Sequence, residues 1–252
     1  MDIRITRVML SICFFALLIQ SCASRNPFIT KDAPTIAHIH IGHAITGWTA
    51  APKKQGLLVV AELQSVEAAT SAELMIRATR NNDMAKAKQF LVDTAMAVDP
   101  SLVDPELANE YGLRRATAEA MTHLILASGT DDASPNVQRT VTKTKIQAQD
   151  ILDRSDELIA FLDVGLESQS FEEIEVIAEE INLAIRSISG GPDQQNNYGL
   201  YNLRQDIEQM VAREDPPYET VDSWYLFSLV KLPDGQWGFS SRRSRGAAGA
   251  GY

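Results

Sequence analysis

Residues 136–166 read NVQRTVTKTKIQAQDILDRSDELIAFLDVGL, and small or apolar side chains recur in this stretch at alternating spacings of four and three. Because an α-helix turns once every 3.6 residues, side chains at these spacings fall on one face. Ser134 and Pro135 precede the stretch as an N-cap and a first-turn proline. The pattern predicts one continuous helix whose core stripe is Val137, Val141, Thr144, Ala148, Ile151, Ser155, Leu158 and Leu162.

The helical pattern continues on both sides of this segment. Ser170 caps a following helix, whose expected core stripe is Ile174, Ile177, Ile181, Ala184 and Ile188. Further helical segments are expected at about 32–48, 57–79, 84–98, 106–127 and 198–213, with short breaks between them. Long helices joined by short loops favour antiparallel packing. We therefore predict an all-α fold, an antiparallel helical bundle of about six helices.

The C-terminal part of the chain changes character at Pro216-Pro217. Residues 224–231 are rich in aromatic and β-branched side chains, and Pro233-Asp234-Gly235 separates them from a second short run at 236–239. Proline presets the first turn position and glycine accepts a positive φ, so this pattern predicts a small C-terminal β-hairpin at 215–240. The Gly- and Ala-rich residues 241–252 are expected to be a disordered tail.

Composition excludes several classes of protein. The chain has 252 residues, of which 45% are hydrophobic, a composition that excludes a wholly disordered chain, a collagen-like repeat and a polytopic membrane protein. Its 33 acidic and 23 basic side chains give a formal net charge of −10. Such an acidic chain lacks the basic surface that binds phosphates, so we expect no nucleic-acid partner.

The first 22 residues have the pattern of a targeting segment. Arg4 and Arg7 flank the start of a twelve-residue apolar run, Val8–Ile19, which is shorter than the roughly 20 residues that span a bilayer. The residues Ile19-Gln20-Ser21-Cys22 that follow resemble the lipobox of bacterial lipoproteins. The resemblance covers the leader alone, and it implies cleavage before Cys22 and acylation, for example with palmitate, of Cys22. By the same resemblance, Ala23 implies an outer-membrane anchor that faces the periplasm.

These features divide the chain into five parts. Residues 1–21 are the expected signal peptide, 22–31 a tether, 32–214 the helical bundle, 215–240 the hairpin and 241–252 the tail. The expected location of the protein is therefore the cell envelope, where the lipid on Cys22 attaches an acidic bundle to the membrane.

The four histidines are the candidate chemical groups. His38, His40 and His43 crowd the first predicted helix, and His123 lies on another. At about 100° per residue, His40 and His43 are about 60° apart and share a face, whereas His38 lies about 160° from His40. A pair of imidazoles on one helix therefore needs a third ligand from elsewhere. His123 is the imidazole available for that position, and Glu119 lies one turn before it.

Imidazole and carboxylate ligands suit Cu, Zn or Ni. If these residues form one site, the His123 nitrogens should lie within about 5 Å of the His40/His43 pair. A haem is the other cofactor considered, although not a c-type haem, because no Cys-x-x-Cys-His sequence is present. The alternative is that the histidines are exposed or make ordinary polar contacts within the bundle.

No sequence pattern of a phosphate loop, a dinucleotide site or a nucleophile elbow is present, so an enzyme is the least favoured class. The first interpretation is a non-enzymatic, membrane-anchored envelope lipoprotein, a helical bundle that binds a protein partner or ligand of unknown identity. The alternative is a periplasmic bundle that binds a transition metal or haem through His40, His43 and His123, with Glu119 as a further candidate ligand.

Overall fold

The computed structural model describes residues 35–192, 198–214, 229–231 and 237–239. The all-α class is confirmed, with seven α-helices in this part of the chain where about six were expected. They are α2 (Ile36–Ile45), α3 (Leu57–Arg80), α4 (Met84–Val98), α5 (Leu113–Ser128), α6 (Pro135–Glu167), α7 (Phe171–Ser189) and α8 (Leu200–Ala212). Short 3-10 turns are η1 (Pro52–Lys54), η2 (Pro100–Leu102) and η3 (Pro105–Asn109).

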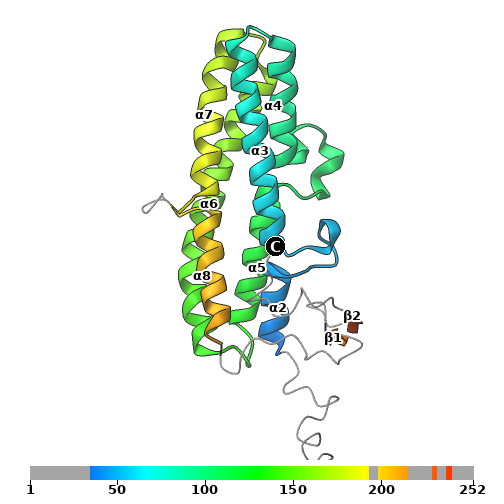
Figure 1. Cartoon of the computed structure of the whole chain (residues 1–252), viewed down its shortest axis with the longest axis vertical. Helices are drawn as coiled ribbons and strands as arrows, with labels where there is room; N and C mark the ends of the chain where they lie inside the picture. The colour runs from blue at the N-terminus through cyan, green and yellow to red at the C-terminus, as the bar shows by residue number, and fades with distance from the viewer. Residues whose placement is uncertain (1–34, 193–197, 215–228, 232–236, 240–252) are drawn as a thin grey trace, which may run out of the picture.

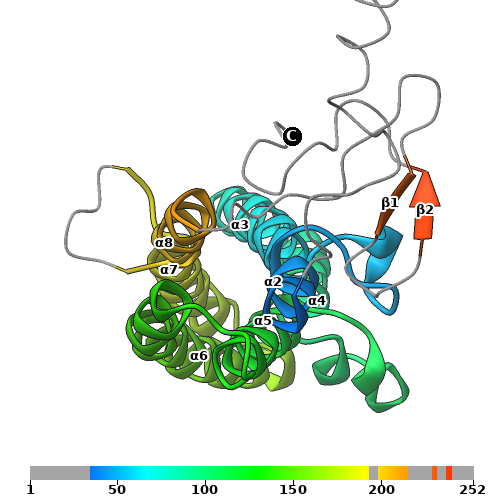
Figure 2. The same cartoon turned by 90° about the horizontal axis from the view of Figure 1, so that it is seen from below.

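The helices form an elongated bundle organised by its two longest members. Helix α6, with 33 residues, runs along the whole bundle and packs on α7, α5, α8 and α4 (Figure 1). Helices α7 and α8 follow one another along α6, while α3 packs against α4, α7 and α5. Viewed along its length, the bundle holds the short helix α2 against α5 at one end (Figure 2).

The predicted stripe of α6 is confirmed, because all eight of its side chains are buried. In α7, Ile174, Ile181 and Ile188 are buried as expected, whereas Ile177 and Ala184, which were also expected in the core, are only partly buried. Ala178 and Ile185 complete the α7 stripe instead. The buried face of α7 is therefore close to the predicted one, but its centre is shifted away from Ile177 towards Ala178 and Ile185.

Truncation of Ile181 tests this packing. Ile181 is fully buried, so Ile181→Ala should lower the free energy of unfolding by about 2–5 kcal/mol through lost burial and a cavity. Leu183→Ala removes the same number of carbons from the same helix, but Leu183 is 60% exposed, so the loss should stay within about 0.5 kcal/mol. Urea unfolding measures both, and equal losses would contradict the assigned face of α7.

The expected helix at 32–48 is wrong at both ends. Helix α2 begins at Ile36, because the Thr35 side chain accepts the His38 N–H at 3.2 Å and so acts as the N-cap. It ends at Ile45, where the N–H groups of Thr46 and Gly47 both bond the Gly42 carbonyl. Helix α2 therefore ends three residues before the expected end at about residue 48.

The expected helix at 106–127 begins too early. Residues 105–109 form the 3-10 turn η3, whose first free N–H, that of Glu106, is capped by the Asp104 carboxylate. Helix α5 starts only at Leu113, after Gly112. A Cβ on Gly112 would lie 2.4 Å from the Val98 carbonyl oxygen, so this close approach to the end of α4 requires glycine.

Near the C-terminus, β1 (Leu229–Lys231) and β2 (Trp237–Phe239) pair in an antiparallel arrangement with Val230 opposite Gly238. The turn predicted between them lies outside the described residues, as do the leader, the tether and the expected tail, so the hairpin as a whole stays a prediction. Among the helices of the described residues, none has the length and apolar character needed to cross a membrane.

Candidate metal centre

Helix α2 is fixed at both of its ends, at one by the loop after α5 and at the other by the start of α3. The Asp132 carboxylate, from the loop after α5, accepts the Ile36 N–H at 2.6 Å and the Ala37 N–H at 3.1 Å. At the other end, a Cβ on Gly56 would lie 2.3 Å from the Ile45 carbonyl carbon, so glycine lets the start of α3 close onto α2. These contacts hold the histidine-bearing face of α2 against α5.

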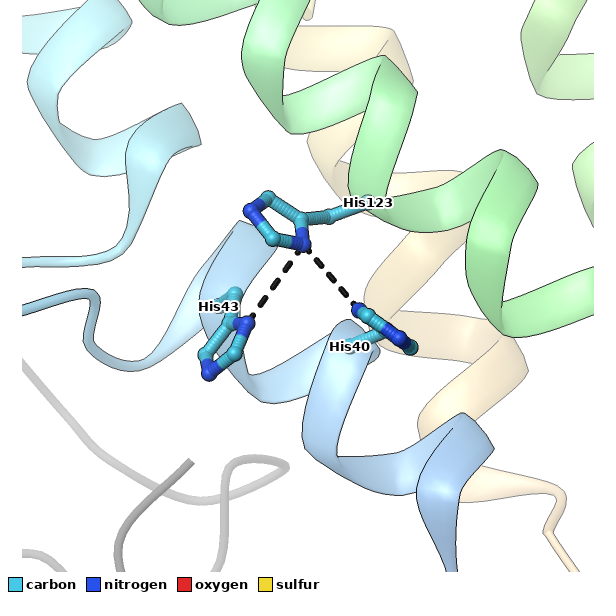
Figure 3. A group of neighbouring side chains, drawn as sticks. All are labelled: His40, His43 and His123. Atoms are coloured by element: carbon cyan, nitrogen blue, oxygen red, sulfur yellow. Dashed lines mark hydrogen bonds between the residues drawn. The ribbon is translucent and has the colours of Figure 1, made fainter. Parts of the chain in front are cut away.

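Three imidazoles meet between these two helices. The Nδ1 atom of His123, on α5, lies 3.1 Å from Nδ1 of His40 and 3.4 Å from Nδ1 of His43 (Figure 3). One nitrogen from each ring lies within 4.8 Å of the other two. His43 is buried, and His40 and His123 are partly buried. The close approach of His123 to the His40/His43 pair, expected from the sequence, is therefore confirmed.

His38 faces elsewhere, as its angular position on the helix predicted. Its Nε2 lies 3.2 Å from the Glu214 carboxylate, and both side chains are buried. Glu214 also accepts hydrogen bonds from the Ser134 hydroxyl at 2.8 Å and the Asn136 amide at 2.6 Å. His38 thus joins α2 to the beginning of α6 and the end of α8, away from the three-imidazole cluster.

Glu119 does not enter the cluster of three. One of its carboxylate oxygens accepts the Tyr111 hydroxyl, and the other accepts the Arg115 Nε–H at 2.9 Å. The Arg115 guanidinium also lies over the Tyr111 ring, 4.6 Å from its centre. The structure therefore gives Glu119 a role in a neighbouring hydrogen-bond chain.

Trp48 forms a wall of the cluster that sequence analysis does not single out. Its ring centre lies 4.3 Å from that of His43 and 4.8 Å from that of His123. The contact depends on how the loop after α2 returns to α5, which is a tertiary feature. The one local signal is an aromatic residue five positions after His43.

Burial favours the neutral form of these rings. The pKa of His40 is lowered from its ordinary value of 6.5 by burial, against a smaller raising effect of Asp132. The pKa of His123 is lowered by burial and then by the neighbouring His40, against a smaller raising effect of Glu119. Both rings are therefore neutral at pH 7, which is the form that binds metal ions.

The nitrogen separations are short enough for the cluster to close around one small ion. Imidazole nitrogens at about 2.0–2.1 Å from a tetrahedral Zn²⁺ are about 3.3–3.4 Å apart, whereas neighbours in a square-planar site are about 2.8–2.9 Å apart. The observed separations are 3.1 and 3.4 Å. The third separation is at most 4.8 Å, so the His40 and His43 nitrogens would approach by up to about 1.5 Å on binding.

The same packing is unsuited to haem. A porphyrin plane would have to separate the imidazole that binds it from its neighbours, yet the His43 and His123 ring centres are 4.7 Å apart and those of His40 and His123 are 5.4 Å apart. The rings already contact one another, so the cluster has the dimensions of an ion site.

Comparison with known proteins adds no relative: no family model matches the chain, and neither the curated proteins nor the solved structures contain a match.

Proposed function

We propose that this chain is a lipid-anchored helical bundle of the cell envelope that binds one transition-metal ion, with Zn²⁺ favoured over Cu²⁺ and Ni²⁺. His40, His43 and His123 supply the three imidazole ligands. Metal binding, the alternative in the sequence analysis, is here placed ahead of partner binding because of the site between α2 and α5.

The convergence of three Nδ1 atoms is the observation that carries this proposal. His123 Nδ1 lies within hydrogen-bond distance of two other Nδ1 atoms. A ring nitrogen of neutral imidazole carries either one proton or one lone pair, so it makes one good hydrogen bond in the ring plane. Three lone pairs directed at one metal ion remove this conflict, because the ion accepts all three.

Zinc is favoured by the ligand type. Three imidazoles bind Zn²⁺ in sites that keep a fourth position for water or another ligand.

A zinc titration with a competing chromophoric chelator tests the proposal. The detergent-solubilised full chain, without a histidine tag, should bind one Zn²⁺ per chain at about pH 7.5. Because the pKa values of His40 and His123 are lowered from 6.5, protons should compete only below that value, so binding should weaken as the pH falls towards about 5. Binding that is absent at neutral pH, or equally strong at the acid end, would contradict the proposal.

The envelope location rests on the leader. The apolar run, the lipobox-like residues 19–22 and Ala23 support export, lipidation of Cys22 and an outer-membrane anchor facing the periplasm. We also propose that residues 215–240 form a hairpin appended to the bundle, with the β1–β2 pair as its support. The bundle is proposed to act without catalysis, as a metal-binding module close to the membrane surface.

A further inference from the structure

The loop after α2 holds Trp48 against the imidazole cluster. The Trp48 backbone N–H donates to the Gln55 carbonyl at 3.0 Å, and the Trp48 carbonyl accepts the Ala51 N–H at 3.1 Å. These bonds close the loop between α2 and α3. The indole consequently packs on two of the three imidazoles, those of His43 and His123, which come from different helices.

Tyr111 is an electrostatic neighbour of the indole. Burial raises the pKa of the Tyr111 hydroxyl, as does its hydrogen bond to Glu119, whereas the Trp48 side chain lowers it. The Tyr111 hydroxyl donates to Glu119, and Glu119 is held by Arg115. The direction of this donation is fixed, because the Glu119 carboxylate only accepts.

We propose that Trp48 is the positioning residue of the metal centre. The inference rests on the proposed function. Trp48 touches the ligands without binding the ion itself. Its role is to hold the rings of His43 and His123 in the orientation that directs their Nδ1 atoms to one point.

The physical basis is the two-fold freedom of the imidazole ring. Rotation of a histidine ring by about 180° about χ2 exchanges the positions of Nδ1 and a carbon, which turns a ligand into a non-ligand. A large ring packed on the imidazole face limits that rotation and excludes water from that side. Loss of groups that orient metal ligands typically weakens binding by about 10–100-fold.

Zinc affinity in three variants tests the role. Trp48→Leu should weaken zinc binding about 10–100-fold, and Trp48→Phe, which keeps an aromatic face, should restore part of the loss. Trp48→Met, which fills space without a rigid ring face, should weaken binding as Trp48→Leu does. Tyr201→Leu is the matched control: Tyr201 is 40% exposed on α8, and loss of its ring should leave the affinity unchanged.

Copper spectroscopy separates positioning from general stability. Cu²⁺ prefers a tetragonal site, and the indole packed on His43 and His123 limits how far the wild-type rings can turn to provide one. Electron paramagnetic resonance of the Cu²⁺-loaded full chain should therefore show a larger parallel hyperfine splitting in Trp48→Leu than in the wild type. A residue that only stabilises the fold would not change this splitting.

Unchanged zinc affinity and unchanged copper spectra in a folded Trp48→Leu variant would overturn the inference while leaving the proposed function intact. If Trp48→Leu fails to fold, Trp48→Met decides, and wild-type affinity in that variant overturns the inference. A wild-type chain that binds neither zinc nor copper would instead refute the proposed function itself.

Discussion

His123→Ala is expected to lower the zinc affinity by more than about 100-fold, to the level of nonspecific binding. His123 is the one member of the cluster that comes from α5, and its Nδ1 is near those of both His40 and His43. Without it, the remaining pair lies on a single short helix and no longer encloses an ion. Calorimetric titration of the detergent-solubilised variant measures the loss.

His38→Ala is the matched control for this experiment. His38 lies on the same helix as His40 and His43, but its ring contacts Glu214 rather than the cluster. Its removal should reduce stability through the buried Glu214 contact while the zinc affinity stays within a few-fold of the wild type. A loss of zinc binding in His38→Ala equal to that in His123→Ala would contradict the assignment of the ligands.

The second large effect concerns the anchor. Cys22→Ser removes the thiol proposed to accept the lipid, so incorporation of labelled palmitate should fall to background and the protein should leave the membrane fraction. Cys13→Ser changes the only other cysteine, within the apolar run of the leader, and should leave labelling intact. Persistent labelling of Cys22→Ser would refute the lipoprotein proposal without bearing on the metal centre.

The elements that sequence predicts best are those whose burial follows one helical period. The α6 stripe from Val137 to Leu162 is buried throughout, because a helix packed along its whole length needs an unbroken apolar face. The N-caps Ser134 and Ser170 are likewise as expected, since each side chain satisfies an N–H within three residues of itself.

The wrong boundaries depend in part on contacts that are distant in the sequence. The start of α2 is capped locally by Thr35 and also by Asp132, a residue 96 positions away from Ile36, and no local pattern contains that second partner. The start of α5 depends on the approach of Gly112 to the end of α4. The helical spacing of apolar residues continues across these boundaries in the sequence, but the helical backbone does not.

The candidate site was likewise predictable from the sequence only in part. The shared face of His40 and His43 follows from helical geometry, as does the separation of His38. That His123 completes the group could be proposed only as the remaining imidazole on another helix. The places of Glu119 and Trp48 depend on Tyr111, Arg115 and the loop after α2, so they emerge only from the fold.

X-ray absorption at the zinc edge tests the central claim most directly. The zinc-loaded full chain, freed of excess metal by gel filtration, should contain one zinc per chain with three imidazole nitrogens at about 2.0–2.1 Å. The multiple-scattering features that identify imidazole should fall in His123→Ala. Zinc that washes off the wild-type chain, or zinc held without imidazole ligands, would contradict the assignment of His40, His43 and His123 as a metal centre.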